Sequence, residues 1–353
     1  MDRAEELRLL ALARGGDQSA FGELARTYRA ELRAHCYRML GSMFDADDAL
    51  QETLLRAWRN LAGFEGRGSV RSWLYAIATN AALDAARHRS RRELPVDFRS
   101  PAGAGADLDA PLTDRPWLGP YPDLWLPQSP SLSPEASYEQ RESVELAFIV
   151  ALQHLAPLQR AVLLLREVAG FSAAEIASQL GTSAASVTSA LQRARSTVRD
   201  RLPATSQQAT LRKLGDQRTR ALVKRYADAL ERGDADTLIG MLTEDATWSM
   251  PPVPTWFRGH QAIREFLTRY PLTERWDHRP THANGQLAVG CYLYDQAGDR
   301  YLPAVIDVLT LDGEKITAVT GFLTAQTLPS PHSAAWPAGA DIFPRFGLPA
   351  STP

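Results

Sequence analysis

The sequence predicts a multidomain protein with two all-α domains, the second carrying a helix-turn-helix, followed by an α+β domain. Three observations predict this fold class. Apolar residues recur at helical spacing through residues 1–92 and again through residues 135–203. A tight glycine turn joins two helices of the second stretch. Beyond residue 216, helical patterns give way to alternating, strand-like segments.

The composition limits the class of protein. A chain of 353 residues is long for one domain, and a hydrophobic content of 44% is enough for several cores. The net charge of −2 creates no general attraction to nucleic acid, so any DNA contact must come from local patches. Cys36 and Cys291 lack the spacing of a metal site and predict core thiols in a reducing compartment. Because no signal peptide or membrane-spanning run is found, we expect a cytoplasmic protein without membrane contact, metal or cofactor.

The first domain, residues 1–92, is expected to be helical throughout. Its long second helix ends at Gly41, and the next helix begins at Asp45, with carboxylates in the first turn, where the helix dipole favours them. A glycine-rich loop at residues 62–69 interrupts the pattern. The third core helix then ends in a cationic run at residues 87–92.

A proline-rich linker is predicted at residues 93–134. Flexible linkers are ordinarily poor in aromatic residues. This one contains the motif Trp117-Leu-Gly-Pro-Tyr-Pro-Asp123 and a second tryptophan, Trp125. The aromatic residues predict that the segment docks onto a folded part of the protein. A locally collapsed loop is the alternative.

The second helical domain, residues 135–203, ends in the predicted helix-turn-helix. Ser172 can cap its first helix, with Glu175 completing a capping box, and Gly181 allows the turn. The outer face of the second helix carries small polar and cationic groups suited to a major groove. They are Ser183, Ser186, Ser189, Gln192, Arg193, Arg195 and Arg199. An amphipathic hairpin with a solvated arginine face is the alternative, but the caps, the turn and the one-sided arginines favour DNA binding.

Residues 216–326 predict an α+β domain. Three short helices precede an expected curled antiparallel sheet, and Asp312-Gly313 is a hairpin turn between its last two strands. The strands are expected at residues 287–294, 301–311 and 316–324. A proline-rich tail, residues 327–353, keeps several aromatic residues and is expected to dock as well.

The first 203 residues resemble an extracytoplasmic-function (ECF) sigma factor of bacterial RNA polymerase. Three motifs carry the resemblance, and their order is more specific than any one of them. They are similar to the helix that binds the polymerase clamp (Asp45–Trp58), the helix that reads the minus-ten element (Ser72–Arg87) and the helix-turn-helix for the minus-thirty-five element (Phe171–Arg199). The resemblance implies two all-α sigma domains without the middle domain of larger sigma factors.

Residues 216–326 resemble a SnoaL-like domain of the cone-shaped nuclear-transport-factor-like fold, through Gly233–Ala246 and Gly259–Phe266. Sigma factors with this extra domain form recognised subgroups, and Trp117–Asp123 is similar to an aromatic-proline motif that they carry. The long linker and the C-terminal extension depart from the plain family. They put the usual control by a separate membrane-bound anti-sigma factor in question.

The resemblance implies a factor that binds core RNA polymerase and promoter DNA and is not itself a catalyst. Candidate polymerase contacts lie on the clamp-like helix: Asp45, Asp48, Gln51, Glu52 and Arg56. Promoter opening needs a pocket for an unstacked base and cations on the backbone. The candidates for this minus-ten site are Phe64, Arg67, Arg71, Asn80, Arg87, Arg91 and Arg92. Trp73 is interpreted as core. In the helix-turn-helix, Ser186, Ser189, Gln192 and Arg193 should face base edges, and Arg195 and Arg199 should face phosphates.

We expect the C-terminal domain to be a built-in regulator of the sigma domains. Its interface should include the linker residues Trp117, Pro120, Tyr121, Pro122 and Asp123. A pocket inside the cone would be lined by Trp248, Trp256, His282, Tyr292 and Asp307, and a small ligand of unknown identity there is an open alternative. A second alternative is a bifunctional protein whose SnoaL-like domain is an isomerase or hydrolase with Asp307 as general base. A plain helix-turn-helix repressor would leave the clamp-like helix unexplained.

Overall fold

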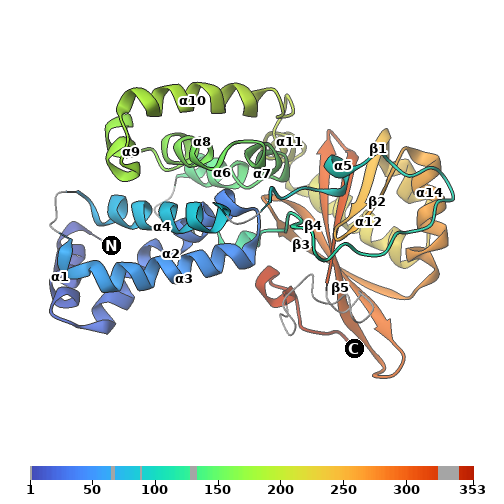
Figure 1. Ribbon diagram of the computed structural model, residues 1–353. Coiled ribbons are helices and arrows are strands. Elements are labelled where there is room, and N and C mark those ends of the chain that lie inside the picture. Colours follow the sequence, from blue (N-terminus) through green and yellow to red (C-terminus); the bar gives the residue numbers. More distant parts are fainter. Residues whose placement is uncertain (1, 65–67, 88–89, 128–132, 325–341) are drawn as a thin grey trace. The chain divides into compact units, whose positions relative to one another are not determined.

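The computed structural model describes residues 2–64, 68–87, 90–127, 133–324 and 342–353. The chain divides into two compact units (Figure 1). The first unit consists of Met1–Arg91 and Trp125–Leu202, and the second of Arg92–Leu124 and Pro203–Pro353. Most of the expected linker therefore belongs to the C-terminal unit.

The first unit is helical, and its first half is a bundle of four helices. They are α1 (Arg3–Arg14), α2 (Gln18–Leu40), α3 (Met43–Asn60) and α4 (Val70–Arg87). Gly41 adopts φ 68° and ends α2 as predicted. The next helix, α3, begins at Met43, two residues earlier than the sequence suggested. The Ser42 side chain accepts a hydrogen bond from the backbone N–H of Asp45 and thereby caps this helix.

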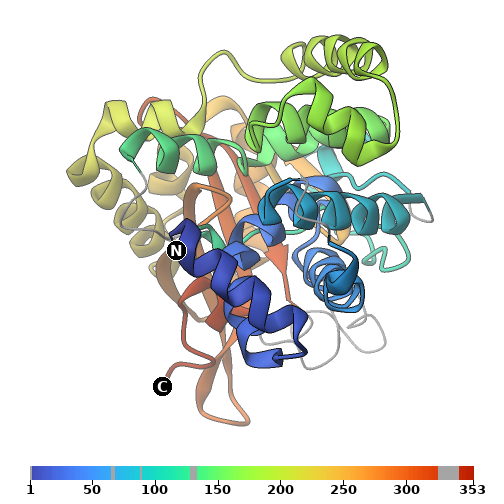
Figure 2. The same cartoon turned by 90° about the vertical axis from the view of Figure 1, so that its left-hand side faces the viewer.

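The second half of this unit holds the predicted helix-turn-helix. Its helices are α6 (Pro134–Glu142), α7 (Leu146–Gln153), α8 (Pro157–Leu163), α9 (Ala173–Leu180) and α10 (Ala184–Arg199). The capping box is confirmed: Glu175 N donates to Ser172 Oγ over 3.2 Å, and Ser172 N donates to Glu175 Oε2 over 2.8 Å. Gly181 takes φ 61° at the turn, and Ser183 caps α10. Both views place α8 between α10 and α4 (Figures 1 and 2).

The second unit is built on a six-stranded sheet with four longer helices. The helices are α11 (Gln207–Leu214), α12 (Asp216–Glu231), α13 (Ala235–Met241) and α14 (His260–Arg269). The strands are β1 (Leu242–Met250), β2 (Val253–Arg258), β3 (Trp276–Ala283), β4 (Gln286–Asp295), β5 (Arg300–Asp312) and β6 (Lys315–Leu323), in the spatial order β2-β1-β6-β5-β4-β3. A four-residue helix, α5 (Pro95–Phe98), lies in the linker segment.

The sheet is mixed, which corrects the antiparallel sheet expected from the sequence. Strand β1 runs parallel to β6, while the other neighbouring strands are antiparallel. Strands β1, β2 and β3 were not predicted. Pro254 and Pro280 interrupt the strand pattern of β2 and β3, and these two are the edge strands, where a missing backbone N–H is tolerated.

The two faces of the sheet contact different parts of the second unit. Helices α12, α13 and α14 pack with one face around a core that includes Tyr226, Trp248 and Val289; we call this the inner face. Because neighbouring residues of a strand point to opposite sides, Gly290 and Tyr292 belong to the other, outer face. Among the described helices, none is long and apolar enough to cross a membrane.

Candidate functional site

The clamp-like helix α3 presents four of its five candidate residues at the surface. Asp48 and Gln51 are exposed, and Glu52 accepts a 2.6 Å hydrogen bond from Arg56 Nε one turn later. Asp45 is only 9% exposed. The accessible part of this face is therefore formed by the residues from Asp48 onward.

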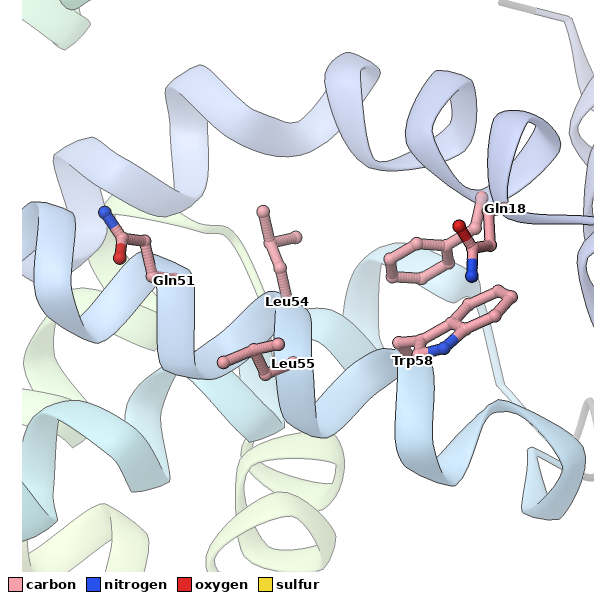
Figure 3. A pocket seen from close by; sticks show the side chains of 6 residues that line it. Gln18, Gln51, Leu54, Leu55 and Trp58 are labelled. Atoms are coloured by element: carbon pink, nitrogen blue, oxygen red, sulfur yellow. The ribbon is translucent and has the colours of Figure 1, made fainter.

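An apolar groove lies beside this face. It has a volume of about 480 Å³ and is lined by Gln18, Phe21, Gln51, Leu54, Leu55 and Trp58 (Figure 3). The ring centroids of Phe21 and Trp58 lie 5.2 Å apart, and the Leu54 side chain points toward α2. Leu55 is 50% exposed at the rim. Sequence reasoning missed this groove because Phe21, Leu54 and Trp58 recur at helical spacing, which is the pattern of a buried helix face.

The minus-ten candidates are in different surroundings from one another. Asn80 and Arg87 are exposed on α4. Phe64 is 7% exposed, because its ring packs on Trp73 at 4.9 Å. The partly buried Trp73 thus covers Phe64. Arg67 lies outside the described residues.

The last two arginines of the minus-ten set divide between the two units. Arg91, in the first unit, lies 2.9 Å through Nη1 from His154 Nδ1. Arg92, in the second unit, donates a 2.5 Å hydrogen bond to the carbonyl oxygen of Trp117. At the C-terminal end of the cationic run, the Arg91 and Arg92 side chains therefore both contact other parts of the protein.

Arg71 joins the two halves of the first unit. Its Nε donates to Glu31 Oε2 over 2.9 Å, and its Nη1 donates to the carbonyl oxygen of Ala169 over 3.0 Å. The guanidinium carbon also lies 4.8 Å from the ring centre of Tyr75 and 5.1 Å from that of Phe171. A candidate DNA contact is thus engaged inside the protein.

Other contacts hold the same two halves together. Arg38 on α2 donates to Ser143 twice, through Nη2 to Oγ at 2.6 Å and through Nε to the carbonyl oxygen at 3.1 Å. Gln179 Nε2 on α9 donates to Ser72 Oγ at the start of α4 over 2.9 Å. Arg160 donates to the carbonyl oxygen of Met39, and burial lowers the pKa of its guanidinium to about 10. The helix-turn-helix therefore packs directly against α4.

The outer face of α10 presents most of the predicted reading set. Ser186, Gln192, Arg193 and Arg199 are exposed. Arg193 Nη1 donates to the partly buried Ser189 Oγ over 2.7 Å, which orients both side chains on one face. Two members have other partners. The Ser183 hydroxyl caps α10, and Arg195 forms a 2.5 Å ion pair with Glu167.

The aromatic-proline motif is bound to the turn between β3 and β4. Tyr121 N donates to Asn284 Oδ1 over 2.9 Å, and Asn284 N donates to Tyr121 O over 2.8 Å. Gly285 N donates to Asp123 Oδ1 over 2.8 Å, and Pro122 pairs with Ala283 in an isolated bridge. Asn284 has φ 56° in this turn, and both it and Tyr121 are fully buried. We call these contacts the linker dock. Pro120 is buried next to it.

The five residues expected to line a pocket in the cone are not brought together. Trp248 and Asp307 lie on the inner face. Trp256 is on the outer face, where its Nε1 donates to Arg99 O of the linker over 2.8 Å. Tyr292 is also on the outer face, with its hydroxyl donating to Pro349 O of the tail over 2.8 Å. His282 is exposed near the end of β3. Because successive side chains of a strand point to opposite faces of the sheet, these five residues do not line one pocket.

Asp307 is enclosed by side chains of its own domain. Tyr226 Oη donates to its Oδ2 over 2.9 Å, and Cys291 Sγ lies 3.6 Å from the same oxygen. Gly321 is needed opposite, since a Cβ there would come within 2.8 Å of Oδ1. Burial raises the pKa of the Asp307 carboxyl to about 6 and raises the pKa of Tyr226 and Cys291. Across the described part of the chain, no cluster of three metal-ligating side chains occurs.

Three family models match successive parts of the chain. Residues 24–92 match sigma-70 region 2, residues 145–198 match sigma-70 region 4, and residues 223–319 match the SnoaL-like domain. The helical unit and its helix-turn-helix thus define a transcription initiation factor of the sigma-70 class. The C-terminal unit contains a SnoaL-like domain.

Whole-chain relatives identify the family within that class. The chain is 41% identical over 344 residues to the ECF RNA polymerase sigma factor SigG of Mycobacterium tuberculosis, covering 96% of this chain and 85% of the relative. It is 27% identical over 304 residues to the probable ECF sigma factor SigI of the same organism, covering 86% and 93%. The chain belongs to the ECF RNA polymerase sigma factors and directs promoter-specific initiation of transcription.

A solved structure shares the fold over most of the chain. The crystal structure of the Mycobacterium tuberculosis ECF sigma factor SigJ matches with a TM-score of 0.52 and 21% identity, over 90% of this chain and 99% of that one. The two chains therefore share a fold.

Proposed function

We propose that core RNA polymerase binds the exposed face of α3 together with the adjacent groove. Asp48, Gln51, Glu52 and Arg56 supply polar contacts, and Leu55 at the rim supplies an apolar one. The polar face and the groove form one continuous surface, because Gln51 belongs to both, and this supports the proposal. An apolar anchor beside charged groups is the usual composition of a binding surface with high affinity.

Promoter DNA is bound by two surfaces of the helical unit. Asn80 and Arg87 on α4 serve the minus-ten element. Ser186, Gln192 and Arg193 on α10 read bases of the minus-thirty-five element, and Arg199 contacts phosphate. The exposure of these side chains supports the assignment.

The packing of the two halves of the helical unit corresponds to a state not engaged with a promoter. The two elements are separated by about 25 base pairs, or about 85 Å of B-form DNA at 3.4 Å per base pair. The 2.9 Å hydrogen bond from Gln179 to Ser72 instead holds the helix-turn-helix against the minus-ten helix. Promoter engagement then requires these contacts, and those of Arg38 and Arg71, to break.

The C-terminal unit regulates this opening through the linker. The observation that carries the proposal is the linker dock: the only chain segment between the two sigma domains is hydrogen-bonded to Asn284 and Gly285 of the SnoaL-like domain. While the linker is docked, less of it is available to connect two separated sigma domains. Docking therefore restrains promoter engagement, and release of the linker favours it.

Catalysis by the C-terminal unit receives less support. A general base needs access to a substrate proton, whereas Asp307 is 5% exposed and hydrogen-bonded by Tyr226. On the outer face, the Trp256 side chain is hydrogen-bonded to the linker and the Tyr292 side chain to the tail. We assign Asp307 a role in the core of the domain.

The test is promoter-specific transcription in vitro with core polymerase and the full chain carrying Asn284→Ala. This change removes the side-chain acceptor for Tyr121 N, so the variant should produce several-fold more transcript than the parent. Glu314→Ala, which removes an exposed ion pair with Arg218 in the same unit, is the matched control and should leave transcription unchanged. Equal transcription by the parent and Asn284→Ala would overturn the regulatory proposal.

A further inference from the structure

The linker closes on itself within the C-terminal unit. Leu118 N donates to Glu93 O over 3.0 Å, and Glu93 also pairs with Trp117 in a parallel bridge. Arg115 Nη2 donates to Glu93 Oε2 over 2.8 Å, and Arg92 binds the carbonyl oxygen of Trp117. Residues at the two ends of a long segment thus form the base of a closed loop. We call these contacts the loop base.

Aromatic packing reinforces the loop base. Phe98 meets Trp117 edge to face, with ring centres 5.8 Å apart at 86°, and the Arg115 guanidinium lies 3.8 Å from the Phe98 ring centre. Trp117 Nε1 donates to Leu112 O over 2.7 Å. Glu93 has only 13% of its side chain exposed, so its ion pair with Arg115 is partly shielded from water.

The body of the loop follows the edge strand β2. Ala102 N donates to Trp256 O over 2.8 Å, and Leu112 N donates to Pro252 O over 3.0 Å. Asp109 exchanges two hydrogen bonds with Thr255, at 2.8 and 2.6 Å. These contacts pair a sheet edge that would otherwise present open backbone groups. The closed loop therefore has a second set of contacts besides its base.

Closure removes chain length from the tether between the sigma domains. At roughly 3.4 Å per residue, the about 25 residues from Glu93 to Trp117 would span about 85 Å when stretched. The rest of the segment from Arg87 to Pro134, about 22 residues, spans only about 75 Å at full stretch. With the loop closed, the fully stretched tether is about 10 Å shorter than the about 85 Å that separates the two promoter elements.

We propose that Glu93, Arg115 and Trp117 are positioning residues that set how far apart the two promoter-binding parts can reach. Opening of the loop base supplies the additional length, so both parts can bind polymerase and promoter together. This inference rests on the proposed role of the linker, but it concerns the loop base rather than the linker dock. The two sets of contacts can be changed separately.

The experiment locks the loop base with a cleavable cross-link. Glu93→Cys and Arg115→Cys are introduced together and joined by a short bis-maleimide whose spacer contains a disulfide; each thiol adds across one maleimide double bond, and reduction cleaves the spacer. The native Cys36 and Cys291 are buried, which protects them from the reagent. We expect promoter-specific transcription with core polymerase to fall at least tenfold in the cross-linked protein and to recover after reduction.

A matched control uses the same chemistry without changing the tether. Arg218 and Glu314 form an exposed 2.9 Å ion pair between α12 and the β5–β6 turn, so the Arg218→Cys/Glu314→Cys pair can be cross-linked in the same unit. Its cross-link should leave transcription unchanged. Similar transcription by the locked and reduced forms of Glu93→Cys/Arg115→Cys would overturn the inference.

A length rescue separates reach from other effects of the cross-link. A flexible insertion of about 25 residues between Pro127 and Ser133 restores the stretched length of the tether while the loop base stays locked. It should recover most of the lost transcription, and failure to recover any would refute a role in reach. If Asn284→Ala leaves transcription unchanged but the locked protein responds as expected, the linker-dock proposal fails while the loop-base inference stands.

Discussion

Arg71 at the start of α4 donates a 3.0 Å hydrogen bond to the carbonyl oxygen of Ala169, just before the helix-turn-helix. The same side chain is a candidate for the minus-ten site. Its Nε donates to Glu31 as well, over 2.9 Å, so two of the three guanidinium nitrogens are engaged inside the protein. Packing of the two halves of the helical unit on each other therefore orients a candidate DNA contact toward a protein partner.

The first prediction concerns the closed packing of the helical unit. Arg38→Ala removes two charged hydrogen bonds to Ser143, each of a kind that contributes about 1.5–3 kcal/mol. We expect faster amide hydrogen exchange in α6 and at the start of α7, because the two halves separate more often. Arg8→Ala, which removes an exposed ion pair with Glu5, should leave that exchange unchanged.

The second prediction separates base reading from phosphate contact on α10. Arg193→Ala should weaken binding of the holoenzyme to its own promoter by roughly 1–3 kcal/mol and relax preference at one position. Arg199→Ala should weaken binding to all sequences alike and reduce the slope of log affinity against log salt by about 1. Salt titrations on matched and scrambled minus-thirty-five elements distinguish the two outcomes. Equal losses on both sequences for Arg193→Ala would remove it from the reading set.

The third prediction tests the groove beside α3. Leu55→Glu places a charge at an apolar rim and should lower affinity for core polymerase at least tenfold, since a desolvated charge without a partner is costly. Leu158→Glu is the control, because Leu158 is similarly exposed, at 49%, and lies outside the groove. Binding is measured by titration of labelled sigma factor with core enzyme. Equal affinity of the two variants would exclude the groove from the interface.

The fourth prediction follows from the buried carboxyl of Asp307. Its pKa is about 6 in the fold and 3.8 as the ordinary value, so the folded state binds the proton more tightly. The stabilisation is complete below about pH 4 and is lost as pH rises through 6, by up to roughly 3 kcal/mol. Asp307→Asn should flatten this part of the pH dependence of unfolding of the C-terminal unit. An unchanged pH profile would contradict the assigned burial.

Local sequence rules predicted the helical elements well, for physical reasons that are visible in particular residues. The caps at Ser172 and Ser183 and the turn at Gly181 depend on neighbours within four positions, so the sequence contains the whole interaction. The linker dock joins Tyr121 to Asn284, far apart in the chain. The motif predicted that the segment docks, but no local pattern specifies its partner.

The candidate site shows the same division. Arg193 and Gln192 could be assigned from the helical period alone, and the structure places both at the surface. The internal partners of Arg71 and the separation of Trp256 from Asp307 depend on tertiary packing and on strand register. Those features could not be derived from the spacing of residue types.

We propose that the sigma domains are packed together before promoter binding and that they separate, with the linker released, to engage the promoter. Fluorescent labels at Arg59→Cys, in the last turn of the clamp-like helix α3, and Thr182→Cys, in the helix-turn-helix, report this distance, and both positions are exposed. Energy transfer between the two labels should be high in the isolated protein. It should fall when core polymerase and promoter are supplied, because the separation of the labels increases by tens of ångströms. Asn284→Ala should shift the isolated protein toward the longer distance. An unchanged label separation in the promoter complex would contradict the account.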